Sequence, residues 1–422
     1  MMAEVSENAV LSRRNDCRLC EGLKLEMALS LKPTAIAEQY VKREQVNLKQ
    51  ETYPLDLYLC GDCGHLQMLD VINPEVLYRG YTFKTSGSLG FVQQLNKGAD
   101  STMTRMFPTD QTPFVVEIGS NDGSVLKYYQ SKGMRVLGVD PAREIARKAT
   151  DSGLETWPEF FTPDIGRKIR KEREQADIVV ANNVYAHADD LNGMTEGIRE
   201  VLSPTGIFSF EVSYLVDIVQ KMLFDTVYHE HLSYHSVKPL ESFFGKHGME
   251  LVDVERIKAK GGSIRGFAQL QEGPREQAPT VRELLDLEKR MGLDRVETFR
   301  EYGEKIDDIK RELHRLLKGY KSQGKTIAGY GSSHTVNTLM HHFELDQFID
   351  FIALDTEWKQ GLFTPNHHIS LVSPEELVKR KIDYTIILAW NYSKPIMEKN
   401  QAYRENGGQW IIPLPEAKVV SE

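Results

Sequence analysis

The stretch Val115–Gly123 (VVEIGSNDG) decides the fold, because a short apolar strand runs directly into a turn that contains two glycines. A strand, a glycine-rich turn and a helix form the first βα unit of an open parallel sheet, and ligands bind at that turn. Glycines there let the backbone approach a ligand closely. We therefore expect a cofactor site formed by Glu117, Gly119, Asn121, Asp122 and Gly123. The alternative is a tight turn without a ligand.

The residues around this turn alternate between predicted strands and predicted helices. The predicted strands are 114–118, 135–139, 176–181 and 206–211, and the predicted helices are 124–132, 145–152 and 191–202. A further helix is expected over 89–106, ended by Pro108 and Pro113. Strands that alternate with helices at this spacing predict a parallel sheet with helices on both faces.

A second β/α block follows a helical, highly charged region at 275–320. Strands are expected at 326–330, 349–354 and 384–389, with helices at 335–343 and 374–379. The predicted fold class is α/β with three parts. These are an N-terminal lobe (1–75), a central Rossmann-like domain that contains the cofactor turn (76–272) and a second, C-terminal Rossmann-like domain (273–422).

All four cysteines lie within the first 63 residues, as two C-x-x-C pairs formed by Cys17 with Cys20 and Cys60 with Cys63. In a reducing compartment such pairs hold metal more often than they form disulfides. Four thiolates around one tetrahedral ion form a closed zinc site, which is structural because no ligand position stays open. Four unrelated thiols, or His65 in place of one sulfur, are the alternatives.

The chemistry of the first turn favours S-adenosylmethionine over a dinucleotide. Asp140 ends the second strand, where a carboxylate accepts hydrogen bonds from ribose hydroxyls, and Asn182 follows the third strand. The dinucleotide pattern G-x-G-x-x-G is absent, and Glu117 precedes the first glycine instead. A carboxylate at this position repels a pyrophosphate but tolerates a cofactor with an amino group and a sulfonium.

The stretch Thr226–His235 (TVYHEHLSYH) gathers three imidazoles, a carboxylate and two phenols. Imidazole can remove a proton near neutral pH without much tuning, and a neighbouring carboxylate can orient it. If this segment is extended, His229 and His231 point to one side and Glu230 to the other. A solvated loop, or a metal site formed by His229, His231 and His235, are the alternatives. The H-E-x-x-H spacing of zinc peptidases is absent.

Composition narrows the class of partner. The net charge is −9 and no Lys/Arg-rich patch stands out, so nucleic acid is not an expected partner. The longest apolar runs, such as Thr385–Trp390, are too short to cross a bilayer. Residues Met1–Glu7 lack the basic and apolar regions of a secretory signal. We expect a cytoplasmic protein, a monomer by default, without a membrane partner.

Together these segments resemble the sugar C-methyltransferase family, whose members place a methyl group on C3 of nucleotide-linked 4-keto-6-deoxyhexoses. The likeness covers nearly the whole chain. The cysteine pairs are similar to the family's zinc domain, Glu117–Gly123 to its S-adenosylmethionine loop, and Tyr228–Tyr234 to its most specific signature. Three later landmarks also match: Gly261–Arg265, Gly329–Gly331 and Ala389–Tyr392.

The resemblance implies roles for individual residues. His231 matches the candidate base, Glu230 its neighbouring carboxylate, and Tyr228 a tyrosine that contacts the substrate. Tyr81 is the other candidate donor to an enolate oxygen. The second glycine-rich turn is expected to meet the phosphates of the nucleotide sugar at a helix N-terminus. The candidate substrate-binding residues are His229, Gly329, Tyr330, Gly331, Ser332, Ser333, Asn337 and Asp355.

The chain departs from the family pattern in two places. The connector reads Tyr81–Ser86 (YTFKTS), so that Phe83 and Thr85 stand where the family usually shows tyrosine and serine. After Gly331 the run Ser332–Asn337 (SSHTVN) lacks the lysine that the family often has there.

The expected activity is S-adenosylmethionine-dependent C-methylation through an enolate, in the biosynthesis of a branched-chain deoxysugar. Three other functions compete with it: methyl transfer to a hydroxyl or amine, non-catalytic binding of a nucleotide sugar, and a zinc-ribbon adaptor that binds other proteins.

Overall fold

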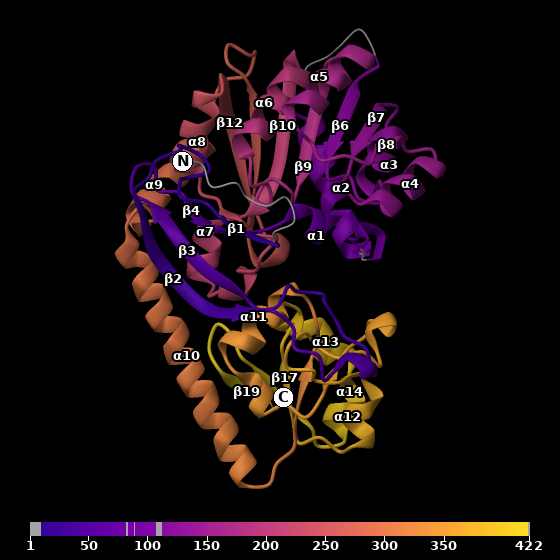
Figure 1. Ribbon diagram of the computed structural model, residues 1–422, viewed down its shortest axis with the longest axis vertical. Helices are drawn as coiled ribbons and strands as arrows, with labels where there is room; N and C mark the ends of the chain where they lie inside the picture. Colours follow the sequence, from indigo (N-terminus) through magenta and orange to yellow (C-terminus); the bar gives the residue numbers. More distant parts are fainter. Residues whose placement is uncertain (1–9, 82, 88, 107–111, 421–422) are drawn as a thin grey trace. The chain divides into compact units, whose positions relative to one another are not determined.

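The computed structural model describes residues 10–81, 83–87, 89–106 and 112–420 (Figure 1). The described residues do not include Met1–Glu7, Thr82, Ser88 or Pro108. The chain packs as two units, each made of separated stretches. The first contains the residues up to Glu26, Tyr58–Val216 and Leu232–Arg295, and the second contains Met27–Leu57, Asp217–His231 and the residues from Val296 onward.

The first unit is built on a seven-stranded sheet of order β12-β13-β10-β9-β6-β7-β8. β6 pairs in parallel with both β7 and β9, whereas β13 runs antiparallel to β10 and β12. All five residues of β6 are buried, as expected for the centre of a sheet covered on both faces. The strands are β6 (Phe114–Ile118), β7 (Arg135–Val139), β8 (Thr156–Trp157), β9 (Ala176–Asn182), β10 (Leu202–Ser213), β12 (Met249–Ile257) and β13 (Ser263–Leu270).

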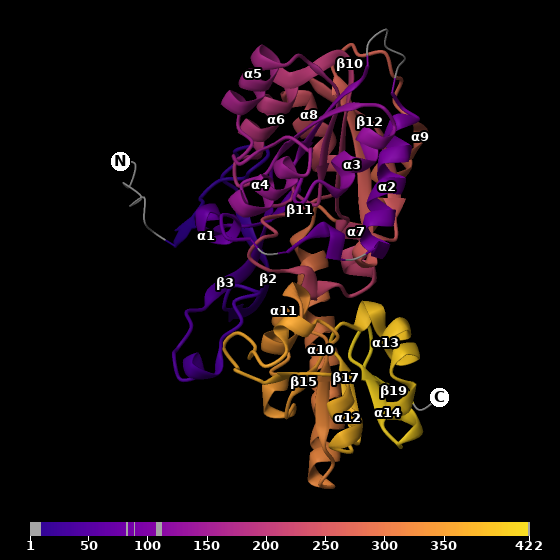
Figure 2. The same ribbon diagram turned by 90° about the vertical axis from the view of Figure 1, so that its right-hand side faces the viewer.

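Helices cover both faces of this sheet (Figure 2). α2 and α3 share a buried core with β6, β9 and β13 that includes Leu95, Tyr129 and Phe267, and α5 packs on α6. The helices of the first unit are α1 (Pro74–Tyr78), α2 (Leu89–Met103), α3 (Ser124–Ser131), α4 (Arg143–Asp151), α5 (Pro163–Glu172), α6 (Leu191–Val201), α8 (Val237–Lys246) and α9 (Pro279–Met291). The division between the two units falls within α7 (Leu215–Gln220).

Short strands form the cysteine-bearing region. β1 (Leu11–Arg13) pairs with β5 (Asp70–Ile72), and a four-stranded sheet has the order β11-β4-β3-β2. Its strands are β2 (Leu25–Thr34), β3 (Tyr53–Cys60), β4 (Leu66–Met68) and β11 (Ser233–Tyr234). The division between the two units falls within β2 and β3.

The second unit is built on a six-stranded sheet of order β16-β15-β14-β17-β18-β19, in which only β19 is antiparallel to its neighbour. Its strands are β14 (Ile327–Tyr330), β15 (Ile352–Ala353), β16 (Leu371–Val372), β17 (Tyr384–Ile387), β18 (Gln409–Ile412) and β19 (Lys418–Val420). Its helices are α10 (Val296–Ser322), α11 (His334–His342), α12 (Glu375–Lys379), α13 (Ser393–Lys399) and α14 (Gln401–Glu405).

The predicted α/β class is confirmed, with a parallel core in each unit and with the cysteines of the N-terminal region in the first unit. A membrane span needs a long, apolar helix, and none of the helices within the described ranges meets that requirement.

Candidate active site and metal centre

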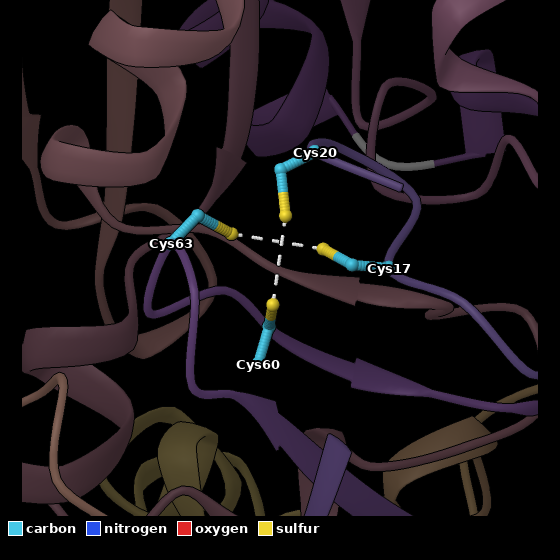
Figure 3. Close-up of side chains that lie close together, drawn as sticks. All are labelled: Cys17, Cys20, Cys60 and Cys63. Carbon is cyan, nitrogen blue, oxygen red and sulfur yellow. Dashed lines mark hydrogen bonds between the residues drawn. The ribbon is translucent and has the colours of Figure 1, made fainter. Parts of the chain in front are cut away.

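The four cysteine sulfurs converge on one point (Figure 3). The Sγ atoms of Cys17 and Cys63 lie 3.6 Å apart, as do those of Cys20 and Cys60. All four lie within 4.8 Å of one another. Zinc–sulfur bonds of 2.3 Å in a tetrahedron would place the sulfurs about 3.8 Å apart, so the residues present fit a Zn²⁺ ion. The hydrogen bond from Cys63 lowers the pKa of Cys17 to about 5, so one of these thiols ionises readily.

His65 is not a fifth candidate ligand. Its ring is fully buried, Nε2 lies 3.1 Å from Ser233 Oγ, and its backbone carbonyl accepts from Cys60 N in the turn that presents the second cysteine pair. Gly64 completes that turn with φ +82°, a conformation that glycine adopts without strain. Cysteines therefore supply the whole ligand set, and the zinc site is closed and structural.

The cofactor loop leaves the sheet where its strand order reverses. β6 lies between β7, the next strand along the chain, and β9, which comes later in the chain. Ligands bind at the carboxyl end of a strand in this position. Gly119 has φ +66°, and a Cβ there would lie 2.3 Å from Val184 Cγ2. Gly123 has φ +75°, and its Cβ would meet Leu154. Both glycines are therefore required by the backbone of this turn.

The polar residues of the loop hold it together and fasten the connector to it. Asn121 N donates to Asp140 Oδ2 at 2.8 Å, and Ala142 N donates to Asp140 Oδ1. Asn121 Oδ1 accepts from Thr85 N, Asn121 Nδ2 donates to the carbonyl of Phe83, and Asp122 accepts from Ser86 N. Of the two departures from the family pattern, Phe83 thus reaches the loop through its backbone carbonyl, and Thr85 reaches it through both its backbone amide and its hydroxyl, which donates to Asn121 Oδ1 at 3.3 Å.

Two buried side chains of the loop, Glu117 and Ser120, have an oxygen without a hydrogen-bond partner among the described residues, and Glu117 is the one that can carry charge. Its side chain is 3% exposed, and Oε2 has no hydrogen-bond partner among the described residues. Burial first, then the charges of Asp140 and Asp122, raise its pKa well above the ordinary value, while a hydrogen bond to Asn182 opposes this. A buried carboxylate oxygen without a partner fits the amino group of S-adenosylmethionine. Burial also raises the pKa of Asp140.

Tyr81 lies in the same unit as the loop, half-buried between two other aromatic rings. Its ring centroid is 6.1 Å from that of Tyr78 and 6.3 Å from that of Phe83.

In the second unit, the first part of the histidine-rich signature, Tyr228–His231, is a turn and not an extended strand, whereas Leu232–Tyr234 belong to the first unit. The amide of His231 donates to the carbonyl of Tyr228 at 2.9 Å, so the side chains of these two residues meet. The Tyr228 hydroxyl lies 2.7 Å from His231 Nε2, and the ring centroids are 3.9 Å apart. His231 Nδ1 lies 2.8 Å from the carbonyl oxygen of Thr226. The expectation for an extended segment is therefore wrong, because the turn brings residues i and i+3 together.

These two contacts fix the tautomer of His231. A carbonyl oxygen only accepts, so Nδ1 carries the proton, and Nε2 then accepts from the Tyr228 hydroxyl. His231 is thereby presented with its basic nitrogen toward a phenol. The residue that orients the imidazole is Thr226, through its backbone, and not Glu230 as the sequence suggested.

Glu230 pairs instead with His334, at the start of α11. Glu230 Oε1 lies 3.4 Å from His334 Nε2, and His334 Nδ1 lies 3.8 Å from Glu38 Oε1. Burial opposes both of the following shifts. The contact with His334 lowers the pKa of Glu230. The contact with Glu230 and the negative charge of Glu38 raise the pKa of His334. Glu230 Oε2 is buried and has no hydrogen-bond partner within the described ranges.

The neighbouring histidines face elsewhere. His229 is buried, and its Nε2 lies 3.3 Å from the carbonyl oxygen of Tyr53. In the first unit, His235 stacks between Tyr185 and His65. Among the residues that the structure describes, the four cysteines are the one group of three or more side chains with the spacing of metal ligands. The alternative of a histidine metal site is therefore not supported.

The second glycine-rich turn follows β14, which again lies where its sheet reverses order. Gly331 has φ +98°, and a Cβ there would lie 2.6 Å from that of Ala389. Ser333 precedes the first turn of α11, and Ser332 Oγ lies 2.9 Å from the Tyr40 hydroxyl. Gly329, one residue before the end of β14, packs closely on Leu388.

Three of the predicted substrate residues are engaged within the protein. The Tyr330 hydroxyl donates to Asp355 Oδ2 at 3.0 Å, and Asn337 Nδ2 donates to the carbonyl of Ala35. Asp355 Oδ1 also accepts from Lys399.

A lysine that no sequence pattern marks, Lys359, supplies the cation at this turn. Lys359 is buried, and its Nζ lies 3.2 Å from the carbonyl oxygen of Ser332 and 2.9 Å from Glu38 Oε1. It comes from a different segment than the start of α11, where the family often has a lysine. A charged run in sequence gives no sign that one lysine in it is buried.

The fold and both sites define an S-adenosylmethionine-dependent methyltransferase with a structural zinc centre, and comparisons with known proteins agree. Residues 17–78 match the family model of a zinc binding domain, residues 91–254 that of a methyltransferase domain, and residues 258–415 that of a C-methyltransferase C-terminal domain. C-methyltransferase NovU from Streptomyces niveus is 35% identical over 408 residues, which is 96% of this chain and 97% of that protein.

The chain therefore belongs to the C-methyltransferase family. Among solved structures, the PH0226 protein from Pyrococcus horikoshii OT3 is 15% identical, with a TM-score of 0.36, over 47% of this chain and 98% of that one. Magnesium protoporphyrin IX methyltransferase from Synechocystis PCC 6803, with bound S-adenosylmethionine, is 11% identical, with a TM-score of 0.32, over 43% and 78%.

Proposed function

We propose that the protein transfers a methyl group from S-adenosylmethionine to C3 of a nucleotide-linked 4-keto-6-deoxyhexose, as a cytoplasmic monomer in the biosynthesis of a branched-chain deoxysugar. The observation that carries this proposal is the Tyr228–His231 pair. An imidazole whose Nδ1 lies against a backbone carbonyl and whose Nε2 faces a phenol is suited to proton removal from carbon.

His231 is the base in this proposal. A ketone at C4 makes the proton on C3 acidic. Nε2 accepts that proton, and the electron pair of the broken C3–H bond moves toward the C4 oxygen to form the enolate. Nδ1 keeps its own proton, and its bond to the Thr226 carbonyl stabilises the imidazolium that forms.

Tyr228 supplies the hydrogen bond to the developing oxyanion. Its hydroxyl donates to Nε2 in the protein alone. When Nε2 takes up the substrate proton it no longer accepts, so the phenol turns to the C4 oxygen. Donors aimed at a developing charge are often the largest contribution to catalysis. Tyr228 is preferred for this role because its hydroxyl contacts the base.

Glu230 and the glycine-rich turn position the sugar nucleotide. The free Oε2 of Glu230 accepts from a sugar hydroxyl, while His334 holds the other oxygen. The turn Gly331–Ser333 receives the diphosphate at the N-terminus of α11. S-adenosylmethionine, held at the loop Glu117–Gly123 with Asp140 and Asn182, supplies an electrophilic methyl group. Carbon C3 would take up that methyl group, the bond from the methyl carbon to sulfur would break, and S-adenosylhomocysteine would leave.

The test is direct. The purified protein is incubated with S-adenosylmethionine and a panel of dTDP-, GDP- and CDP-linked 4-keto-6-deoxy sugars, and the products are weighed and assigned by NMR. A gain of one methyl group on C3 supports the proposal. A methyl group on oxygen or nitrogen, or no product from any member of the panel, would exclude it.

A further inference from the structure

Trp358 is a large aromatic side chain left open to solvent. It lies in the short 3-10 helix Glu357–Lys359, which follows β15, and it is 60% exposed. The two other tryptophans of the second unit, Trp390 and Trp410, are 9% and 1% exposed. An indole ring that stays exposed contributes little of the folding free energy that its burial would provide.

The open ring is nevertheless held in place. The Tyr40 ring meets Trp358 edge to face, with centroids 6.2 Å apart and an interplanar angle of 82°. Lys359 Nζ lies 5.2 Å from the Trp358 centroid and 4.6 Å from the Tyr40 centroid. Both oxygens of Glu38 hold that ammonium, so it stays at the rings. A ring fixed in this way loses little conformational entropy when a flat ligand stacks on it.

The same contacts connect Trp358 to the glycine-rich turn. The Tyr40 hydroxyl lies 2.9 Å from Ser332 Oγ, and Lys359 also donates to the Ser332 carbonyl. β14 and β15 are adjacent parallel strands, so the turn after β14 and the segment that carries Trp358 leave the same edge of the sheet. One tyrosine ring separates the hydroxyl of Ser332 from the exposed indole, a span within the reach of a single nucleoside diphosphate.

A small cavity beside the turn has room for about one water molecule. Tyr40, Ser332, Ser333 and His341 line it. His341 is 6% exposed, and no described residue contacts its Nε2 through a hydrogen bond. A buried ring nitrogen that lacks a partner is a group that a polar ligand can satisfy.

We propose that Trp358 is the platform on which the base of the substrate's nucleoside diphosphate stacks, while its phosphates lie at Ser332 and Ser333. This inference rests on the proposed function, because it takes the substrate to be nucleotide-linked. Stacking accepts any flat base, so Trp358 provides affinity for the nucleotide and leaves the choice of base to polar neighbours.

The experiment uses the full-length protein and free dTDP, UDP, GDP and CDP as probes. Tryptophan fluorescence and calorimetry follow their binding to the wild type and to Trp358→Ala, Trp358→Phe, Trp157→Phe and Tyr392→Ala. Trp157 is a tryptophan of the first unit, and Tyr392 is a second exposed aromatic side chain of the second unit. These two variants are the controls for fluorescence and for affinity.

We expect at least one diphosphate to bind and to quench the wild type and Trp157→Phe alike. Trp358→Ala should weaken its binding roughly tenfold or more, whereas Trp358→Phe should lose the quenching and keep the affinity, because phenylalanine also stacks. Tyr392→Ala should bind as the wild type does. If Trp358→Ala binds a diphosphate with unchanged affinity, the stacking role of Trp358 is overturned but the proposed function is not. If no diphosphate binds to the wild type, both the stacking role and the proposal of a nucleotide-linked substrate are overturned.

Discussion

Glu117→Gln tests how the first unit holds the amino group of its cofactor. The variant keeps the size of the side chain and its bond to Asn182 but removes a buried group that titrates. Because burial and two neighbouring carboxylates raise its pKa, Glu117 holds its proton to a higher pH in the folded protein than in the unfolded chain. A cationic amino group is bound only by the ionised form, so binding of S-adenosylmethionine should release a proton.

The sign and size of the effect follow from linkage. Below the pKa of Glu117, one proton is lost for each cofactor bound, so the Kd should fall up to about tenfold for each unit of rising pH. In the free protein, the raised pKa of Glu117 contributes to the free energy of unfolding. This contribution is fully present below pH 4.5, the pKa of Glu117 in the unfolded chain, and it is lost as the pH rises toward the pKa in the folded protein. That loss is at most about 1.4 kcal/mol per pH unit.

Calorimetry in buffers of different ionisation enthalpy counts the protons released, and urea unfolding across pH measures the stability. Glu117→Gln should bind S-adenosylmethionine more weakly at high pH, release no proton and lose the pH slope of the Kd. Glu172→Gln, at an exposed position in α5, is the matched control. A variant at Glu117 that retains the wild-type slope would refute the assignment.

Three further predictions concern the base, the metal centre and a buried acid. His231→Ala should lower turnover by roughly 10²- to 10⁴-fold with nearly unchanged affinity for S-adenosylmethionine, and wild-type-like kinetics would remove His231 from its role. Cys60→Ser should release zinc and lower the melting temperature, which metal analysis and calorimetry measure; a metal-replete, equally stable variant would contradict a structural site. Burial raises the pKa of Asp225 to about 7, against a hydrogen bond from Trp390, so its contribution to stability is lost as pH rises from about 4 to 7. Asp225→Asn keeps an acceptor for Trp390 and should remove this part of the pH dependence of urea unfolding, whereas an unchanged profile would show that Asp225 is ionised throughout.

The local elements of the fold could be predicted from the sequence. The strands Phe114–Ile118 and Arg135–Val139 have the predicted bounds, because a buried strand and its turn are encoded in adjacent residues. Gly119 and Gly123 stand where the backbone has positive φ, and both cysteine pairs meet at one point. The strand expected over 349–354 is shorter, β15 (Ile352–Ala353). The hairpin β12–β13 and the helix α5 were not predicted.

What the sequence did not reveal depends on contacts between distant segments. Glu230 stands beside His231 in the chain, yet the turn directs it to His334, more than 100 residues further on. The group that orients His231 is the backbone carbonyl of Thr226, which no side-chain pattern marks. Lys359 reaches the glycine-rich turn from a different loop.

Solvent exchange at the substrate carbon tests the central claim most directly. A dTDP-linked 4-keto-6-deoxy sugar is incubated in D₂O with the protein and S-adenosylhomocysteine, which has no methyl group to give, and NMR follows the hydrogen on C3. The wild type should replace that hydrogen with deuterium faster than buffer alone does, and His231→Ala should not. Exchange by His231→Ala at the wild-type rate, or a wild type that methylates without catalysing exchange, would contradict the account.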